Sequence, residues 1–214
     1  MSESILSYVI GVVQGDAYLS NGRVLLEVAD KDFASNFAKS LGKLCSRKPY
    51  PIIAKVRQEG NRHYSSYLVS GGNKRIFGLL SQCIKSLKPI IEEQPSMFLR
   101  GFFDSEGTSW IGHSWKNYKG KKYCYSYPCV AVYNTDKQLL EYVQRLLTKL
   151  DIQSILSVNH PKGTKLRIRG HTSKRRKTVW VLRIRQQLSV SNFFEKIGFS
   201  IMRKQAIWRR HPRK

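Results

Sequence analysis

Two acidic residues, Asp16 and Glu106, hold the same place in two similar nine-residue stretches, residues 9–17 and 99–107. Each stretch is an apolar run with a glycine third, a small residue seventh and the acid eighth. Two equivalent segments that each end in one carboxylate can bring those carboxylates together about a pseudo-two-fold axis. Because carboxylate oxygens are hard ligands, we predict that this pair holds a divalent cation, Mg²⁺ or Mn²⁺.

The strong positive charge of the chain indicates what such a metal would act on. The 214 residues include 38 Lys and Arg against 14 Asp and Glu, a formal net charge of +24. Residues 98–214 hold 25 of the basic residues and 6 of the acidic ones. Since 41% of the residues are hydrophobic, the chain reads as a folded domain rather than a basic tail. We therefore expect nucleic acid as the partner.

Other classes of protein are disfavoured. No apolar run reaches the 18 residues that a membrane span needs, and no leader pattern opens the chain, so we expect an intracellular protein with no membrane partner. The closest cysteines, Cys124 and Cys129, have four residues between them, which is not zinc-ligand spacing. We expect reduced thiols and no zinc site.

Hydrophobic periodicity predicts two similar series of helices and strands. After the first stretch we expect a strand over 23–28, a helix over 33–44, extended segments over 52–57 and 64–69, and a helix over 74–87 that ends before Pro89. After the second we expect a strand over 129–133, a helix over 139–150, strands over 165–169 and 178–185, and a helix from Ser189 or Ser191 to Ile197. The fold class is therefore α+β, with two pseudo-symmetric αββαββα repeats over 1–95 and 96–214.

The second repeat is longer than the first. Gly11 and Gly101 are 90 residues apart, whereas the equivalent strand residues Val28 and Val132 are 104 apart. The second repeat thus carries about 14 extra residues between its acidic stretch and this strand. We place them in residues 115–125, a Lys- and Tyr-rich hairpin arm.

The acidic stretches themselves are predicted to be helices, over 4–17 and 96–106. Gly11 and Gly101 cost helix propensity, roughly 1 kcal/mol each, and this is tolerated where another backbone approaches closely. We expect the two helices to pack against each other through these small faces. Acids at helix C-termini are disfavoured by the helix dipole, which a bound cation would offset.

Strands with alternating arginines are the predicted DNA-binding surface. In 166–169 and 182–185 apolar residues alternate with Arg, so one face packs on helices while the other presents guanidinium groups. Such a face on an antiparallel sheet suits a duplex groove. The candidate DNA-binding residues, each facing either a base or a phosphate, are Arg23, Arg57, Arg167, Arg169, Arg183 and Arg185.

Both nine-residue stretches resemble the motif of the LAGLIDADG homing endonucleases, in the monomeric form with two motifs per chain. The second stretch matches at Leu99, Gly101, Asp104 and Gly107, with Glu106 at the position that takes Asp or Glu. The first matches at Gly11 and Asp16 but has Gln14 for the sixth-position acid and Ala17 for the final glycine. The resemblance implies one antiparallel β-saddle per repeat that binds DNA.

The resemblance also implies an activity: site-specific double-strand cleavage of a long asymmetric DNA target by metal-dependent phosphodiester hydrolysis. Asp16 and Glu106 would be the metal ligands, with Ala17 and Gly107 beside them at the motif ends. The nucleophile would be a water, with no covalent intermediate. The protein would reside wherever the host intron DNA lies, in the cytoplasm, nucleoid or an organelle.

Further catalytic and binding candidates follow from the same resemblance. Asp30 and Asn134 come just after a strand in each repeat and would contact the attacking water, or else cap the next helix. Lys204 would polarise the phosphate, or else be an ordinary surface lysine. The first repeat has Glu93 and Gln94 at the place of Lys204, and Lys31 is a substitute candidate. Two arm lysines complete the DNA-binding set, Lys121 and Lys122.

Two other functions fit this scaffold. An intron maturase would bind its host intron RNA and can lose an acid at the eighth position, whereas this chain keeps both acids. A DNA-binding regulator would normally append a helix-turn-helix domain, for which residues after Arg210 leave no room. Intein splicing is disfavoured because the chain neither starts with Cys or Ser nor ends with His-Asn.

Overall fold

The computed structural model describes residues 2–59, 62–168 and 171–209, and the chain divides into two compact units. The first unit comprises the chain up to Ser105 together with Ile197–Arg203. The second comprises Glu106–Lys196 and the chain from Lys204. The predicted repeat boundary at 95/96 refers to the sequence repeats and stays a prediction.

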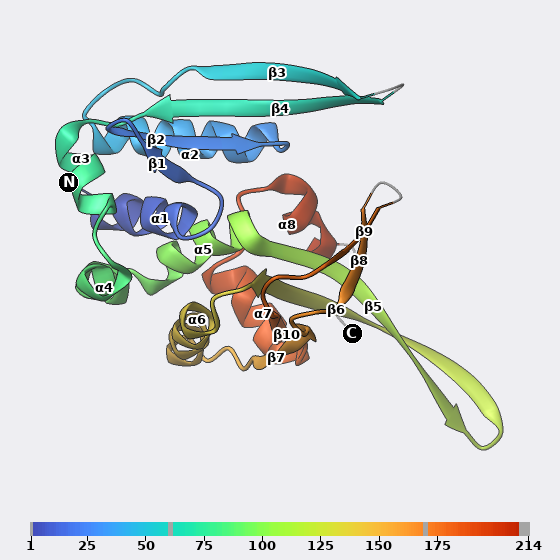
Figure 1. The fold of residues 1–214 in the computed structure, drawn as a ribbon. Coiled ribbons are helices and arrows are strands. Elements are labelled where there is room, and N and C mark those ends of the chain that lie inside the picture. Colours follow the sequence, from blue (N-terminus) through green and yellow to red (C-terminus); the bar gives the residue numbers. More distant parts are fainter. Residues whose placement is uncertain (1, 60–61, 169–170, 210–214) are drawn as a thin grey trace. The chain divides into compact units, whose positions relative to one another are not determined.

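The first unit is a four-stranded antiparallel sheet with helices (Figure 1). The strand order is β1-β2-β4-β3, and α2 packs on β2 and β4. The alternation of β2 explains this packing, because Val24 and Leu26 are fully buried whereas Arg23 is exposed. Its elements are α1 (Glu3–Val13), β1 (Tyr18–Ser20), β2 (Arg23–Val28), α2 (Lys31–Leu44), β3 (Ile52–Glu59), β4 (Arg62–Gly71), α3 (Lys74–Leu80), α4 (Ile84–Glu93) and α5 (Pro95–Glu106), whose last residue falls in the second unit.

The second unit repeats this plan. Its sheet has the order β5-β6-β10-β7, so the four strands correspond in sequence to β1, β2, β4 and β3 of the first sheet. A separate two-stranded sheet, β8 with β9, is inserted between β7 and β10. Its elements are β5 (Gly107–Tyr118), β6 (Lys121–Asn134), α6 (Lys137–Lys149), β7 (Ile155–His160), β8 (Lys165–Ile168), β9 (His171–Lys174), β10 (Val179–Ile184), α7 (Gln187–Lys196) and α8 (Met202–Arg209), whose first two residues belong to the first unit.

The predicted α+β class with two similar repeats and antiparallel sheets is confirmed. One helix prediction is wrong: the region 74–87 forms two helices, and α4 continues through Pro89. Burial of Leu87 and Ile91, at 1% and 0% exposed, holds α4 together across the residue that lacks an N–H. The strand β7 and the helix α8 were not predicted.

The two motif helices pack backbone against backbone. A Cβ atom on Gly11 would overlap the carbonyl oxygen of Phe98, and one on Gly101 would overlap that of Tyr8. The predicted packing through small faces is therefore confirmed. The predicted extent of the first helix is wrong, because α1 ends at Val13 and the chain turns so that Ala17 N–H donates to the Val12 carbonyl at 3.1 Å.

The hairpin of β5 and β6 extends beyond the rest of its sheet, as Figure 1 shows. Its strands are joined by Lys119 and Gly120, whose φ angles of 47° and 74° fit a type I′ turn. The twist of this two-residue turn matches that of the strands on either side. In the first unit the equivalent strands β1 and β2 pair over three positions. The predicted arm over 115–125 is confirmed.

We expect Gly11→Ala to destabilise the protein by about 1–3 kcal/mol or more, because the added methyl group meets backbone that cannot move independently. Gly78→Ala is the matched control. A Cβ atom added to this helical glycine would have no atom within 4 Å apart from its chain neighbours and the backbone of its own helix, so the change should raise the free energy of unfolding by up to about 1 kcal/mol. Urea unfolding of both variants measures the difference. Equal midpoints would show that the helix contact is looser than the geometry requires.

Candidate functional site

The first motif acid, Asp16, lies three residues beyond the end of α1 and is exposed. The helix ends before it because the chain turns at residues 14–16. Ala17, which follows, is 7% exposed and begins the path into β1. Asp16 thus presents a solvent-accessible carboxylate at the C-terminal end of a helix, where the dipole favours a cation.

The second motif acid, Glu106, is the last residue of α5 and is half-buried. The Asn134 side-chain amide donates to Glu106 Oε1 at 3.4 Å. Asp136, not Asn134, is the N-cap of α6, since Asp136 Oδ1 accepts from Leu139 N–H at 3.0 Å. The structure therefore brings two predicted site residues together and assigns the capping role to a third.

The donor chemistry of these residues fits a divalent cation. Among the described residues no group of three or more His, Cys, Asp and Glu side chains gathers at one point. A cation here would have few protein ligands and would complete its shell with water and phosphate oxygens, as Mg²⁺ commonly does. Gly107, predicted beside Glu106, is buried as the first residue of β5.

The acids at the start of α2 bind the start of α8, a contact that sequence reasoning missed. Asp30 accepts from Arg203 Nε at 2.6 Å and from Arg203 Nη2 at 2.8 Å. This bidentate pair raises the pKa of Arg203. Asp32 Oδ2 accepts from the Met202 N–H at 2.6 Å, at the first residue of α8. Both acids therefore fix where α8 begins.

Asp104, the sixth residue of the second motif, fixes the segment before α8. Its buried carboxylate, 1% exposed, accepts from Ser200 N at 2.9 Å, Ser200 Oγ at 2.6 Å and the Tyr8 hydroxyl at 3.2 Å. Burial and the charge of Asp104 raise the pKa of Tyr8 well above its usual value. A network with this many donors to one carboxylate is a rigid anchor.

Lys204 follows this anchor on α8 and is buried, at 6% exposed. The interpretation as an ordinary surface lysine is therefore wrong. The Ser109 hydroxyl donates to the Lys204 carbonyl at 2.7 Å, which ties this turn of α8 to β5. A buried ammonium is rare and requires a specific environment. Lys31, by contrast, is exposed beside an open pocket of about 570 Å³ that Asp30, Asp32 and Tyr67 also line.

The sheet of the first unit has a polar, solvent-facing side. Glu27 accepts from Lys55 Nζ at 2.8 Å and from Ser66 Oγ at 2.8 Å, and Arg57 lies 3.6 Å away. These hydrogen bonds lower the pKa of Glu27. Arg57, a predicted DNA-binding residue on β3, thus lies near an acid, while Arg23 is exposed on β2, the strand that carries Glu27.

The alternation predicted for the second unit is confirmed in β10. Leu182 and Ile184 are buried, Arg183 is half-buried and Arg185 is exposed. Arg183 donates to Ser157 Oγ at 3.1 Å and to Asn159 Oδ1 at 3.2 Å, which fixes its guanidinium on the face shared with β7. Arg167 is exposed on β8, in a different sheet, and Arg169 lies outside the described residues.

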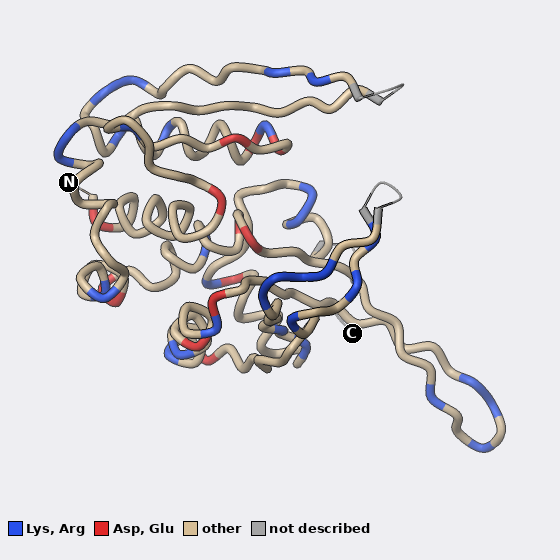
Figure 2. The backbone as a smooth tube through the Cα atoms, viewed as in Figure 1, with Lys and Arg blue, Asp and Glu red and all other residues tan. Residues whose placement is uncertain are grey.

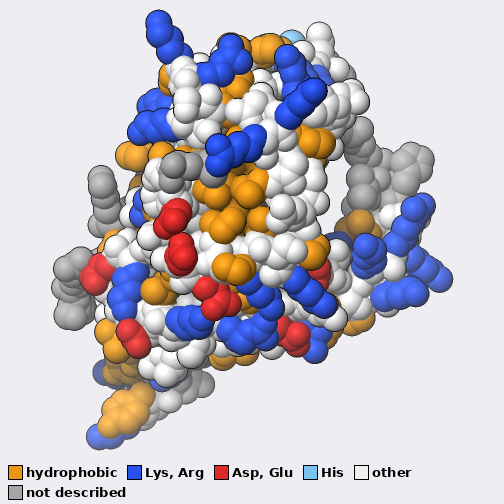
Figure 3. Space-filling view, turned by 90° about the vertical axis from the view of Figure 1, so that its left-hand side faces the viewer, with side chains coloured by type: hydrophobic (Ala, Val, Ile, Leu, Met, Phe, Trp, Pro, Cys, Tyr) orange, Lys and Arg blue, Asp and Glu red, His pale blue; other side chains and the backbone are white. Residues whose placement is uncertain are grey.

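Basic residues lie on several elements, as Figure 2 shows for β8 and the tip of the β5–β6 hairpin. Lys and Arg side chains also spread over the face drawn in Figure 3, with several acidic side chains among them in the lower half of the view. At the hairpin tip the cross-strand register pairs Lys121 with Tyr118 and Lys122 with Asn117. The two predicted lysines therefore point to opposite faces of the hairpin.

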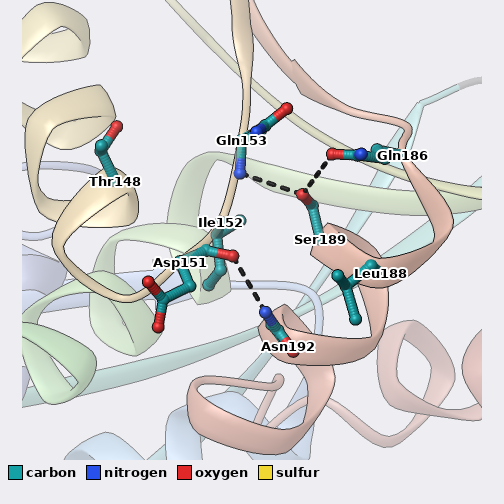
Figure 4. Close-up of a pocket in the computed structure, with 8 residues that line it drawn as sticks. All are labelled: Thr148, Asp151, Ile152, Gln153, Gln186, Leu188, Ser189 and Asn192. Carbon is teal, nitrogen blue, oxygen red and sulfur yellow. Dashed lines mark hydrogen bonds between the residues drawn. The ribbon is translucent and has the colours of Figure 1, made fainter.

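A small cavity of about 330 Å³ in the second unit lies apart from these residues (Figure 4). Ser189 Oγ accepts from Gln153 N–H at 3.0 Å and donates to Gln186 at 3.1 Å, and the Asn192 amide donates to the Asp151 carbonyl at 2.9 Å. Its polar groups thus bond to one another and hold the start of α7 to the end of α6. No predicted site residue lines it.

Comparison with known proteins agrees with this geometry. A family model described as the LAGLIDADG-like domain matches residues 93–198. The uncharacterized protein MJ0398 of Methanocaldococcus jannaschii is 34% identical over 206 residues, which cover 94% of this chain and 68% of that protein. The uncharacterized protein MJ0314 of the same organism is 29% identical over 167 residues, covering 71% of this chain and 56% of that protein.

Solved structures show the same fold. Variants of the homing endonuclease I-DmoI align with a TM-score of 0.56 at 16% identity, covering 92% of this chain and 96% of theirs. I-DmoI in complex with DNA and Mn aligns with a TM-score of 0.53, also at 16% identity, over 92% and 97% of the two chains. With its two motifs and two similar sheets, the chain belongs to the LAGLIDADG homing endonuclease family. No helix among residues 2–59, 62–168 and 171–209 is long and apolar enough to cross a membrane.

We expect Asp104→Asn to lower the free energy of unfolding by about 1.5–3 kcal/mol, because it removes a buried charge that accepts three hydrogen bonds. Asp16→Asn makes the same chemical change at an exposed acid and should stay within about 0.5 kcal/mol of wild type. Chemical denaturation of both variants tests this. A stable Asp104→Asn protein would mean that the amide satisfies the same donors.

Proposed function

We propose that this protein is a site-specific DNA endonuclease that makes double-strand breaks in a long, asymmetric duplex target. The observation that carries this proposal is the packing of the two motif helices through Gly11 and Gly101. Asp16 follows the end of the first helix, and Glu106 is the last residue of the second. The fold shared with I-DmoI, for which a complex with DNA and Mn is solved, supports it. The surplus of basic residues supplies the affinity for phosphates.

The two sheets support the proposal of a long and asymmetric target. Each has four antiparallel strands in the same order, so each suits one half of a duplex site. Their polar faces differ: Glu27 holds Lys55 and Arg57 in the first, whereas Ser157 and Asn159 hold Arg183 in the second. Because different side chains would meet the two halves, the two half-sites need not be related by symmetry.

The roles of the acids follow from their positions. Asp16 and Glu106 would each hold a divalent ion, and Asn134 orients the Glu106 carboxylate by its hydrogen bond. When bound, such an ion lowers the pKa of a water and neutralises charge on the phosphate and the leaving oxygen. Lys204, which is buried on α8 and whose carbonyl accepts from the Ser109 hydroxyl, would add positive charge toward the phosphate.

We expect Asp16→Asn and Glu106→Gln each to reduce cleavage by at least about 100-fold while duplex affinity stays within a few-fold of wild type. The experiment incubates the protein with a randomised duplex library and Mg²⁺, and sequences the ends of cleaved molecules. EDTA should abolish cleavage and leave binding intact. Asp151→Asn, an acid with a side chain 82% exposed at a surface ion pair, is the matched control and should cleave normally.

Three outcomes bear on the proposal. A recurrent site cut on both strands, lost in both acid variants, supports it. Sequence-specific binding without cleavage would overturn it in favour of a DNA-binding regulator. Absence of DNA binding together with tight binding to a structured intron RNA would overturn it in favour of a maturase.

A further inference from the structure

The arm, defined as residues 112–127 of the β5–β6 hairpin, is a two-stranded ribbon with an unusual composition. It carries lysines at positions 116, 119, 121 and 122, and residues 107–135 contain no Asp or Glu. Large side chains along it are solvent-exposed, at 68% for Trp115, 62% for Tyr118 and 50% for Tyr125. Exposed aromatic side chains that lie close together on a protein surface often mark a binding site, and the lysines beside them favour an anionic partner. The composition of the arm therefore indicates a binding surface.

The cross-strand register divides the arm into two chemically different faces. Ser114 pairs with Tyr125, Lys116 with Tyr123, and Tyr118 with Lys121, and the two residues of a pair lie on the same face. Lys116 also lies over the Tyr125 ring, 5.5 Å from its centre. We call the face that these residues share the tyrosine face: Tyr118, Tyr123, Tyr125, Tyr127, Lys116 and Lys121.

The opposite face of the arm is less charged and less regular. Its pairs are His113 with Ser126, Trp115 with Cys124, and Asn117 with Lys122. The His113 ring nitrogen and the Ser126 hydroxyl are 2.9 Å apart, so part of this face is occupied by its own contacts. The tyrosine face is therefore the stronger candidate for a polyanionic partner.

The tyrosine face continues, in register, onto the face of its sheet that carries Arg183. Tyr127 pairs with Gly112, and two residues further along each strand Cys129 pairs with Trp110 and Ala131 with Thr108. Ala131 in turn pairs with Arg183 of β10. Since alternate residues of a strand share a face, the tyrosines and Arg183 lie on one side of one continuous sheet.

We propose that the arm binds duplex DNA beside the core target, on the side of the second repeat only, and lengthens the footprint there. This inference rests on the proposed function. A two-stranded ribbon fits the major groove, where the lysines can meet phosphates and the tyrosine hydroxyls can bond to backbone oxygens. The arm has no counterpart in the first unit, where β1 and β2 pair over three positions, so the footprint is asymmetric.

The length of the arm sets the size of the effect. The four outermost pairs, from Trp115 to Tyr118, extend about 14 Å at roughly 3.4 Å per residue. Base pairs are also stacked about 3.4 Å apart, so this outer part of the arm spans about four base pairs.

The first test removes the arm and maps the protected duplex. Residues 115–124 are replaced by an Asn-Gly turn that joins the paired residues Ser114 and Tyr125, a pair of the same hydrogen-bonded type as Tyr118 and Lys121. Hydroxyl-radical footprinting on the selected target should show about four base pairs less protection at one end and an unchanged opposite end. An unchanged footprint would overturn the arm proposal while cleavage by the same variant leaves the proposed function standing. No duplex binding by wild type would instead overturn the proposed function.

A second test uses point variants that keep the fold of the arm. Lys116→Gln removes one charge from the tyrosine face and should reduce the slope of log affinity against log salt by about one. The control Lys149→Gln removes an exposed charge at the end of α6 and should leave this slope unchanged. Tyr125→Ala should weaken duplex binding several-fold, whereas Trp115→Ala on the opposite face should not. Equal effects of the two aromatic variants would overturn the assignment of the face. Loss of binding only to single-stranded DNA would overturn the duplex as the occupant.

Discussion

The close contact between α1 and α5 is the constraint on which the rest of the structure depends. At Gly11 and Gly101 each helix presents backbone, not side chain, to the other, so neither position tolerates a Cβ atom. Around this contact the rings of Phe98 and Phe102 stack at 6.1 Å and both are fully buried. Acids that follow or end such helices oppose the helix dipole, a cost that the proposed binding of a cation would offset.

Five of the acids described above fall into two groups that differ in what their carboxylates contact. Asp104, Asp30 and Asp32 accept hydrogen bonds from residues 200–203 and so fix the segment where α8 begins. Asp16 and Glu106 lie at helix ends, the first exposed and the second half-buried beside Asn134. The first group anchors the segment that leads into α8, and the second is the group that we propose to hold metal.

Much of the fold was readable from the sequence, because apolar spacing in α2, α6 and β10 is set by burial against one core. The motif acids and the arm were readable from the internal repeat. The continuation of α4 through Pro89 was not, since tertiary burial overrode the local signal. The start of α8 and the partner of Asp30 were also hidden, because both depend on residues about 170 positions away in the chain. The roles of the site residues stay predictions.

The contacts of residues 197–203 with the rest of the first unit have a consequence for biosynthesis. Asp32 meets Met202 and Asp30 meets Arg203 across sequence separations of 170 and 173 residues. The first half of the chain therefore emerges from the ribosome long before residues 202 and 203, which complete the hydrogen bonds of Asp32 and Asp30. Such non-local closure slows folding and leaves an incomplete intermediate exposed during synthesis. Although the molecule is built from two similar repeats, the first unit completes these hydrogen bonds only after residues 197–203 have been translated.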